Sequence, residues 1–195
     1  MTALPEPSAN EPHLFTVAEY AALGEVEFGY SELQEGRILM SPSPAPDHNH
    51  ASLQLAMQLS AQLPAELEVI QDVDLDLELT EPDAPGFSRR PDLLVLERRA
   101  RRRVRSEGGL MRASEVSVVI EIVSPGSKRM DRIVKRGEYA DAGIPHYWIV
   151  DLAEPVSLVA CHLAGEFGYQ DPGDVTGVFT TDVPFPVRLD LDVLV

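Results

Sequence analysis

Three short apolar runs in the middle of the chain restrict its fold more than any other feature. They are PDLLVL at 91–96, SVVIEIV at 117–123 and YWIVD at 147–151. Each has the length and continuity of a central β-strand. Between the second and third runs, residues 128–142 place apolar side chains at helical spacing before Gly143, which predicts an amphipathic helix. A strand, a helix and a strand in this order imply a crossover connection, and therefore a mixed sheet flanked by helices.

The segments before these runs predict a short helix, a hairpin, a longer helix and a strand. They cover residues 16–24, 31–40, 48–63 and 69–79. The short helix begins with a capping box, in which Thr16 is the N-cap and Glu19 the reciprocal partner. The last segment alternates apolar and acidic residues, which predicts one half-buried strand whose acidic row faces solvent. After residue 151, weak short strands separated by Gly and Pro turns extend to the C-terminus.

The composition is that of an ordinary globular domain, with 44% hydrophobic and 25% charged residues. Residues 1–14 are rich in Pro, Glu, Ser and Asn and predict a disordered lead-in, which leaves residues 15–195 as a single domain. Cys161 is the only cysteine, so an intrachain disulfide and a Cys-based zinc site are both excluded. No segment has a secretory pattern or the length of a membrane span. We therefore expect a cytoplasmic protein without membrane association.

The charge of the chain gives opposing indications about binding to nucleic acid. The net charge of -16 argues against nucleic acid as a partner, because affinity for DNA comes largely from phosphate neutralisation. The basic residues are clustered, however, around the strand of Asp92 and along the helix at 128–142. A local basic cleft on an acidic body can still bind a nucleic-acid backbone. Much of this charge lies in the Arg-rich segment 98–105, which we expect to be mobile and solvated.

Two carboxylates stand in or beside apolar strands. Asp92 opens the first apolar run, and Glu121 lies inside the second, on the sheet face lined by Val119 and Val123. Burying an ionised carboxylate is costly unless it is paired, hydrogen-bonded or bound to a metal. An ion pair with an arginine of the adjacent helix is one explanation. The other is a metal site, because Asp92 and Glu121 on neighbouring strands would supply the oxygen ligands that suit Mg²⁺.

Two further residues remain ambiguous on the sequence alone. Helix geometry places an apolar stripe from Met130 to Ala140 on one face and Lys135 on the other, which predicts a solvated lysine. Lys135 would act at the site only if this polar face lines the cleft beside Glu121. His48 follows a Pro-rich connector at the start of a helix, and is either an inert surface residue or a phosphate contact.

Four strings, taken together, resemble the Uma-type restriction endonucleases, a bacterial family of the PD-(D/E)XK superfamily. They are SELQEGRILMSPSPAPDH, RPDLLVLERR, EVSVVIEIVSPGSKRMDRIVKRGEYADAGIPHYWIVD and the closing PFPVRLDL. The likeness runs from about Thr16 to the C-terminus. It implies an α/β (α+β) fold with a restriction-endonuclease-like core, in which a mixed β-sheet is flanked by helices and followed by extra C-terminal strands.

The resemblance also implies a set of site residues. Asp92 matches the PD of the superfamily motif and Glu121 its second acidic position, so both would hold Mg²⁺ or Mn²⁺. Glu32 matches a family glutamate that would be a third acidic group. The usual lysine position is Val123 here, and the resemblance implies that Lys135 on the following helix replaces it.

Three hypotheses follow. The first is a Mg²⁺-dependent DNA endonuclease in which Lys135 acts on the scissile phosphate or the attacking water, and which forms a homodimer to cut both strands. The second is a catalytically inactive member that binds nucleic acid or a partner protein, consistent with the charge of -16 and with Val123. The third is a metal-dependent hydrolase of a smaller phosphodiester, for which an acidic surface is a smaller obstacle.

Overall fold

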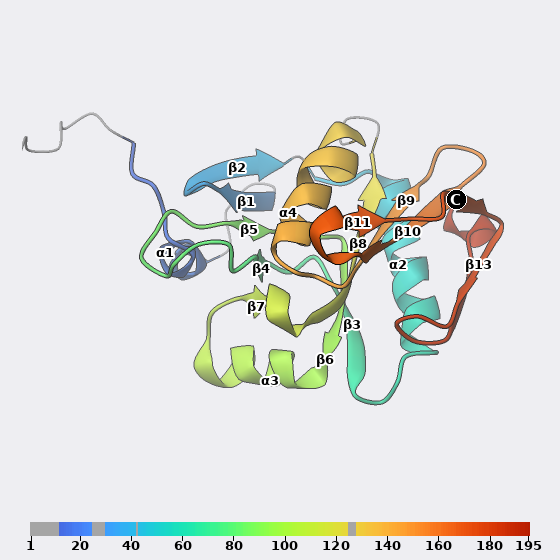
Figure 1. Ribbon diagram of the computed structural model, residues 1–195, viewed down its shortest axis with the longest axis horizontal. Coiled ribbons are helices and arrows are strands. Elements are labelled where there is room, and N and C mark those ends of the chain that lie inside the picture. The colour runs from blue at the N-terminus through green and yellow to red at the C-terminus, as the bar shows by residue number, and fades with distance from the viewer. Residues whose placement is uncertain (1–11, 25–29, 42, 125–127) are drawn as a thin grey trace, which may run out of the picture.

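All three apolar runs lie in one central sheet of the computed structural model (Figure 1). The structure describes residues 12–24, 30–41, 43–124 and 128–195, so most of the predicted lead-in lies outside the described residues. The strands of this sheet are β3 (Leu67–Gln71), β6 (Leu93–Glu97), β8 (Val116–Val123), β9 (His146–Asp151), β10 (Ser157–Leu163), β11 (Tyr169–Gln170) and β12 (Asp174–Thr176). Their order is β11-β10-β9-β8-β6-β3, and β12 also pairs with β10.

The predicted crossover is confirmed. Strands β8 and β9 are parallel, and a π-helical turn (Met130–Lys135) followed by α4 (Arg136–Asp141) connects them. Strand β6 is antiparallel to β8, with Leu93 opposite Ile120. Asp92 and Glu121 are the next residues along these two strands, so the predicted neighbours are adjacent. The sheet is therefore mixed, as the sequence predicts.

Side chains of β8 alternate between two hydrophobic cores. Ile120 and Ile122 pack with Trp148 and with the apolar face of α2 (Pro46–Ser60). Val119 and Val123 point to the opposite face, where they pack with a second set of residues that includes Tyr139 of α4. Helices α2 and α4 thus cover opposite faces of the central sheet (Figure 1). Glu121 shares its face with Val119 and Val123, as predicted.

A smaller sheet lies beside the first and carries Glu32. Its order is β2-β1-β5-β4-β7, and its strands are β1 (Tyr30–Gln34), β2 (Arg37–Ser41), β4 (Leu75–Asp76), β5 (Ser88–Arg89) and β7 (Met111–Arg112). Strands β1 and β2 form the predicted hairpin. Helix α1 (Val17–Leu23) begins with the predicted capping box, because Glu19 N donates to Thr16 Oγ1 and Thr16 N donates to a carboxylate oxygen of Glu19.

The extra C-terminal strands form a separate ribbon that closes over α2. Strands β13 (Val178–Thr181) and β14 (Val187–Asp190) pair with each other in antiparallel register. Gln58 of α2 anchors the ribbon, since its Nε2 donates to Asp190 O at 3.1 Å and its Oε1 accepts from Asp190 N at 2.7 Å. Phe179 also packs against Trp148, so the ribbon completes the core on this face of the sheet.

The prediction of one strand over residues 69–79 is wrong. The chain leaves the central sheet after Gln71, turns at Asp72 and enters the smaller sheet as β4. Asp72 has a left-handed φ of 51°, which no regular strand contains, and its N–H donates to Asp92 O at 3.3 Å. The alternation still describes burial, because Leu75 and Leu77 are buried. Period-two patterning predicts which residues are buried but does not detect a break between two sheets.

The Arg-rich segment is largely exposed to solvent, as expected, but it is ordered rather than mobile. It forms α3 (Arg98–Glu107), whose Ala100 is buried in the core beneath. Arginine is a good helix former, and carboxylates offset much of the charge repulsion. Both Nε and Nη2 of Arg103 donate to Glu115 at 2.7 Å, and Arg101 makes a similar pair with Glu68.

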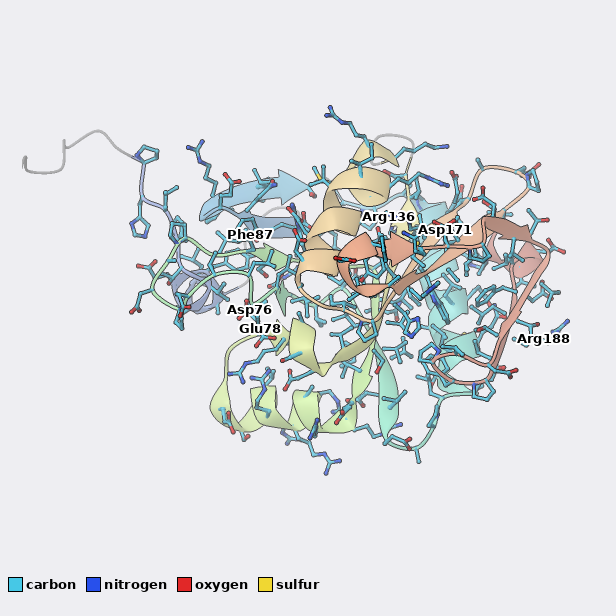
Figure 2. All side chains as sticks on the ribbon, viewed as in Figure 1. Asp76, Glu78, Phe87, Arg136, Asp171 and Arg188 are labelled. Carbon is cyan, nitrogen blue, oxygen red and sulfur yellow. The ribbon has the colours of Figure 1, made fainter. Side chains whose placement is uncertain are left out.

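Helix α4 is fixed against the outer edge of the central sheet. Arg136 donates to Asp171 Oδ2 and to Tyr169 O, both at 2.8 Å, and Figure 2 shows its side chain beside Asp171. Tyr169 in turn donates from its hydroxyl to Ile144 O at 2.7 Å, just before β9. These contacts join the crossover helix to β11. Among the described residues, no helix is long and apolar enough to cross a membrane.

Candidate active site

A pocket of about 730 Å³ opens where the two sheets meet the N-terminus of α2. Glu32 enters it from β1, His48 from α2 and Glu121 from β8. Asp92, just before β6, and Lys135, in the π-helical turn, complete this group. The structure therefore brings together all four residues that the sequence resemblance places in the site, from elements far apart in the chain.

Asp92 is held from both sides. Its Oδ2 accepts a 2.6 Å hydrogen bond from Ile122 N, which joins it to the strand that carries Glu121. Its Oδ1 lies 3.2 Å from His48 Nε2, and this hydrogen bond raises the pKa of His48. His48 is thus neither an inert surface residue nor free to bind phosphate through Nε2. His50, the other histidine of the segment, is exposed.

Glu121 and Lys135 are in direct contact. Lys135 Nζ lies 2.9 Å from Glu121 Oε1, and Tyr139 donates its hydroxyl to the same oxygen at 2.7 Å. Lys135 is 7% exposed and Glu121 is 3% exposed, so this pair is almost sealed from solvent. Helix periodicity predicted a solvated lysine, and that prediction is wrong. The placement implied by the family resemblance is the one observed.

The error in the helix prediction has a clear physical origin. The buried face carries Asp131, Lys135 and Tyr139, spaced four residues apart, whereas the apolar Ile133 is 65% exposed. Hydrophobic periodicity assumes that apolar side chains turn inward, but here paired polar groups do so. The segment is also π-helical at its start, a form that occurs frequently at functional sites. Asp131 and Tyr139 were missed for the same reason.

Glu32 connects Lys135 to a second buried cation. Its Oε1 lies 3.3 Å from Lys135 Nζ, and its Oε2 accepts from Arg89 Nη1 at 2.9 Å. Arg89 is fully buried and makes two further 2.7 Å hydrogen bonds to Glu138 of α4. Burial would raise the pKa of Glu32, but Lys135 and Arg89 lower it below its usual value. The sequence analysis counted Arg89 among the basic residues of the expected cleft rather than as a partner of Glu32, and it missed Glu138, because neither belongs to a recognisable motif.

This buried network contains more acids than bases. Among the described residues, Lys135 and Arg89 pair with four carboxylates, which belong to Glu32, Glu121, Asp131 and Glu138. Burial raises the pKa of Glu121 to about 8 despite the opposing effect of Lys135. Burial alone would lower the pKa of Lys135, but the surrounding carboxylates raise it, so the ammonium stays charged. The surplus of negative charge is what a divalent cation would neutralise.

The donor groups fit a hard metal ion such as Mg²⁺. Both hydrogen bonds to Glu121 fall on Oε1, so no described residue hydrogen-bonds to Oε2. Asp92 lines the same pocket, where its Oδ2 contacts Ile122 N and its Oδ1 contacts His48 Nε2. Two carboxylates with water in the remaining positions are a usual coordination set for Mg²⁺. Within the described ranges, no group of three or more His, Cys, Asp or Glu side chains is placed to hold a metal ion, so water would supply most of the ligands.

The predicted local basic cleft is not found at this pocket. Of the described residues that line it, only Arg90, Lys128 and Lys135 are Lys or Arg. Seven are acidic, namely Glu32, Asp47, Asp72, Asp92, Glu121, Asp131 and Asp151. The arginines of α3 follow the far end of β6 from Asp92, and several of them pair with Glu68 and Glu115. The basic residues are therefore clustered in the sequence but not around this pocket.

The mixed sheet and its carboxylate-bearing neighbouring strands define a protein of the restriction-endonuclease-like class. The model of the Uma2 family, described as "Putative restriction endonuclease", matches residues 17–184, and the chain belongs to this family. Val123, at the usual lysine position of the superfamily motif, is buried in the core.

One solved structure is similar over nearly the whole chain. It is described as "a putative nuclease belonging to DUF820 from Anabaena variabilis ATCC 29413". The similarity covers 92% of this chain and 97% of that one, with a TM-score of 0.66 and 18% sequence identity. A likeness at this identity establishes the fold and not the activity. No curated protein matches the sequence.

Proposed function

We propose that this protein is a Mg²⁺-dependent endonuclease that hydrolyses phosphodiester bonds in DNA, and that Mn²⁺ can replace Mg²⁺. The observation that carries the proposal is the contact between Lys135 Nζ and Glu121 Oε1 in a pocket that also contains Asp92. A lysine beside two metal-binding carboxylates is the constellation of the PD-(D/E)XK superfamily. Membership of the Uma2 family agrees with this chemistry.

Each residue has a distinct role in the proposed reaction. Asp92 and Glu121 would hold the metal ion, and His48 orients Asp92 through its 3.2 Å contact. When bound, Mg²⁺ polarises a phosphoryl oxygen and makes a water molecule more acidic. Lys135 offers a fixed ammonium group to the charge that develops on the phosphate, or orients the attacking water. Glu32 holds Lys135 in place, and Arg89 holds Glu32.

Plasmid cleavage tests the proposal. Wild-type protein with Mg²⁺ should nick or linearise plasmid DNA, and Asp92→Ala should lose this activity by at least about 100-fold, as expected when a metal ligand is removed. Asp141→Ala, at an exposed carboxylate of α4, is the matched control and should cleave normally. Equal cleavage by wild type and Asp92→Ala, or cleavage that persists in EDTA, would contradict the assignment.

A smaller phosphodiester is a second candidate substrate. It is favoured by the seven carboxylates against three Lys and Arg in the pocket lining, because such a wall repels a long polyanion. Hydrolysis of bis(p-nitrophenyl) phosphate without any cleavage of DNA would support this candidate. Cleavage of both DNA strands would require two sites, and for that activity we propose a homodimer.

A further inference from the structure

A second pocket adjoins the active site and has no role in the mechanism above. Its volume is about 590 Å³, within the range of small-molecule sites. It shares part of its wall with the first pocket, namely Tyr30, Ser43, Asp72 and Arg90. A ligand group in the second pocket would therefore lie beside a phosphate in the first.

The shared wall carries a flat, fixed surface. The guanidinium of Arg90 lies over the ring of Tyr30, with its carbon 5.4 Å from the ring centroid. Both Nε and Nη2 of Arg90 donate to Asp74 at 2.9 Å, and Tyr20 donates its hydroxyl to the same carboxylate at 3.5 Å. Arg90 is thus locked in orientation, and Asp74 compensates its charge. The face of its guanidinium that is turned to Tyr30 is covered by that ring, so a ligand would stack on the outer face of Arg90 or of Tyr30.

The rest of the second pocket is lined by apolar and acidic side chains. Its apolar side chains are Val73, Val104, Leu110 and Met111, and its acidic ones are Asp72 and Asp74. Arg90 is the only Lys or Arg among its described lining residues. Such a wall does not favour a phosphate backbone. An aromatic ring and a guanidinium plane beside apolar side chains are instead the elements that stack nucleobases.

We infer that this second pocket binds an unpaired nucleobase, next to the phosphate that enters the active site, and that the substrate is single-stranded or locally unpaired DNA. This inference rests on the proposed nuclease function for the identity of the neighbouring phosphate. A base inside a duplex is stacked between its neighbours and cannot enter a pocket without being flipped out, which costs free energy. Stacking would also supply affinity that the acidic lining of the active site does not.

Binding of 2-aminopurine oligonucleotides tests the inference without requiring cleavage. Ca²⁺ would replace Mg²⁺, because it takes the same kind of oxygen ligands. Wild type and Tyr30→Phe should bind a single strand and quench the 2-aminopurine emission. Tyr30→Leu, which loses the ring, should bind about 5-fold to 150-fold more weakly, the range expected for one lost base stack. Phe167→Leu removes an exposed aromatic ring elsewhere and should bind like wild type.

Several outcomes would overturn the inference. One is an unchanged affinity for the single strand in a Tyr30→Leu variant whose circular dichroism is normal, and another is the absence of quenching in the wild type. The others are that the wild type binds the matching duplex, or a free deoxynucleotide, at least as tightly as it binds the single strand. The nuclease proposal fails separately. Metal-dependent cleavage that is unaffected by Tyr30→Leu would support the nuclease proposal and contradict the base site. Quenching of 2-aminopurine without any cleavage would support the base site and contradict the nuclease proposal.

Discussion

Lys135 Nζ lies 2.9 Å from Glu121 Oε1, although the two residues come from a π-helical turn and from the middle of a central strand. The contact explains how a glutamate can sit within an apolar strand, because the ammonium offsets part of the cost of burying a carboxylate. It does not neutralise the whole network, in which the described residues include four carboxylates and two cations.

Removing the ammonium group should destabilise the protein strongly. Lys135→Met leaves Glu121 and Glu32 without their shared cation, and breaking a buried pair in this way costs about 3–5 kcal/mol. Measured above about pH 8, where Glu121 is ionised, the added substitution Glu121→Gln should recover about 1–3 kcal/mol, because the uncompensated charge is then removed. Urea unfolding of the two single variants and the double variant measures this coupling. Arg129→Met, an exposed neighbour, should change stability by less than about 0.5 kcal/mol. Additive effects of the two substitutions would contradict the pairing.

Stability should also depend on pH through Glu121. Its pKa is about 8 in the folded protein, compared with 4.5 for an ordinary glutamate. Between these values the folded state keeps a proton that the unfolded state has released. The contribution is therefore full below about pH 4.5, falls as the pH rises and is lost above about 8. Glu121→Gln does not titrate, so its unfolding free energy in EDTA should lack this decline. Parallel profiles for wild type and variant between pH 5 and 8 would show the assignment to be wrong.

His48 should affect metal binding through Asp92. Its Nε2 contacts Asp92 Oδ1, and groups that orient metal-binding carboxylates typically contribute about 10–100-fold to metal affinity. We expect His48→Ala to weaken Mn²⁺ binding by that factor, as measured by calorimetry. His50→Ala is the control, because His50 is exposed two residues away on the same helix. Equal Mn²⁺ affinity in wild type and His48→Ala would mean that the contact has no role in positioning the ligand.

The arginines of α3 should have little effect on DNA cleavage. Arg102 and Arg105 form no ion pair among the residues that the structure describes, and neither lines the pocket. Arg102→Gln combined with Arg105→Gln should therefore cleave DNA at the wild-type rate. A fall of about 10-fold or more would indicate that the basic helix contacts DNA after all.

The sequence predicted the central architecture because the signals there are local and consistent. Continuous apolar runs at β6, β8 and β9, with a helix between the last two, leave few alternatives to a crossover in a mixed sheet. The capping box of α1 and the hairpin of β1 and β2 were equally local signals. The adjacency of Asp92 and Glu121 followed from the pairing of β6 with β8.

The rest of the site depends on contacts that no local pattern encodes. Lys135, Asp131 and Tyr139 turn inward because buried carboxylates and hydroxyls meet there, in opposition to hydrophobic periodicity. The fully buried Arg89 joins two elements that are distant in the chain, so neither its burial nor its partners could be predicted. The sequence did not predict the break between the two sheets at Asp72, because a single alternating pattern continues from a strand of one sheet into a strand of the other.

Calorimetric titration with Mn²⁺ tests the central claim most directly, because it measures the proposed metal site without depending on a substrate. Wild-type protein should bind Mn²⁺ at a site that requires Asp92 and Glu121. Asp92→Asn, which keeps the size of the side chain and removes its charge, should lose at least about 100-fold in affinity for that site, whereas Asp141→Asn should bind like wild type. Undetectable binding by the wild type, or equal binding by wild type and Asp92→Asn, would contradict the metal-dependent nuclease and favour a member of the family that binds without cutting.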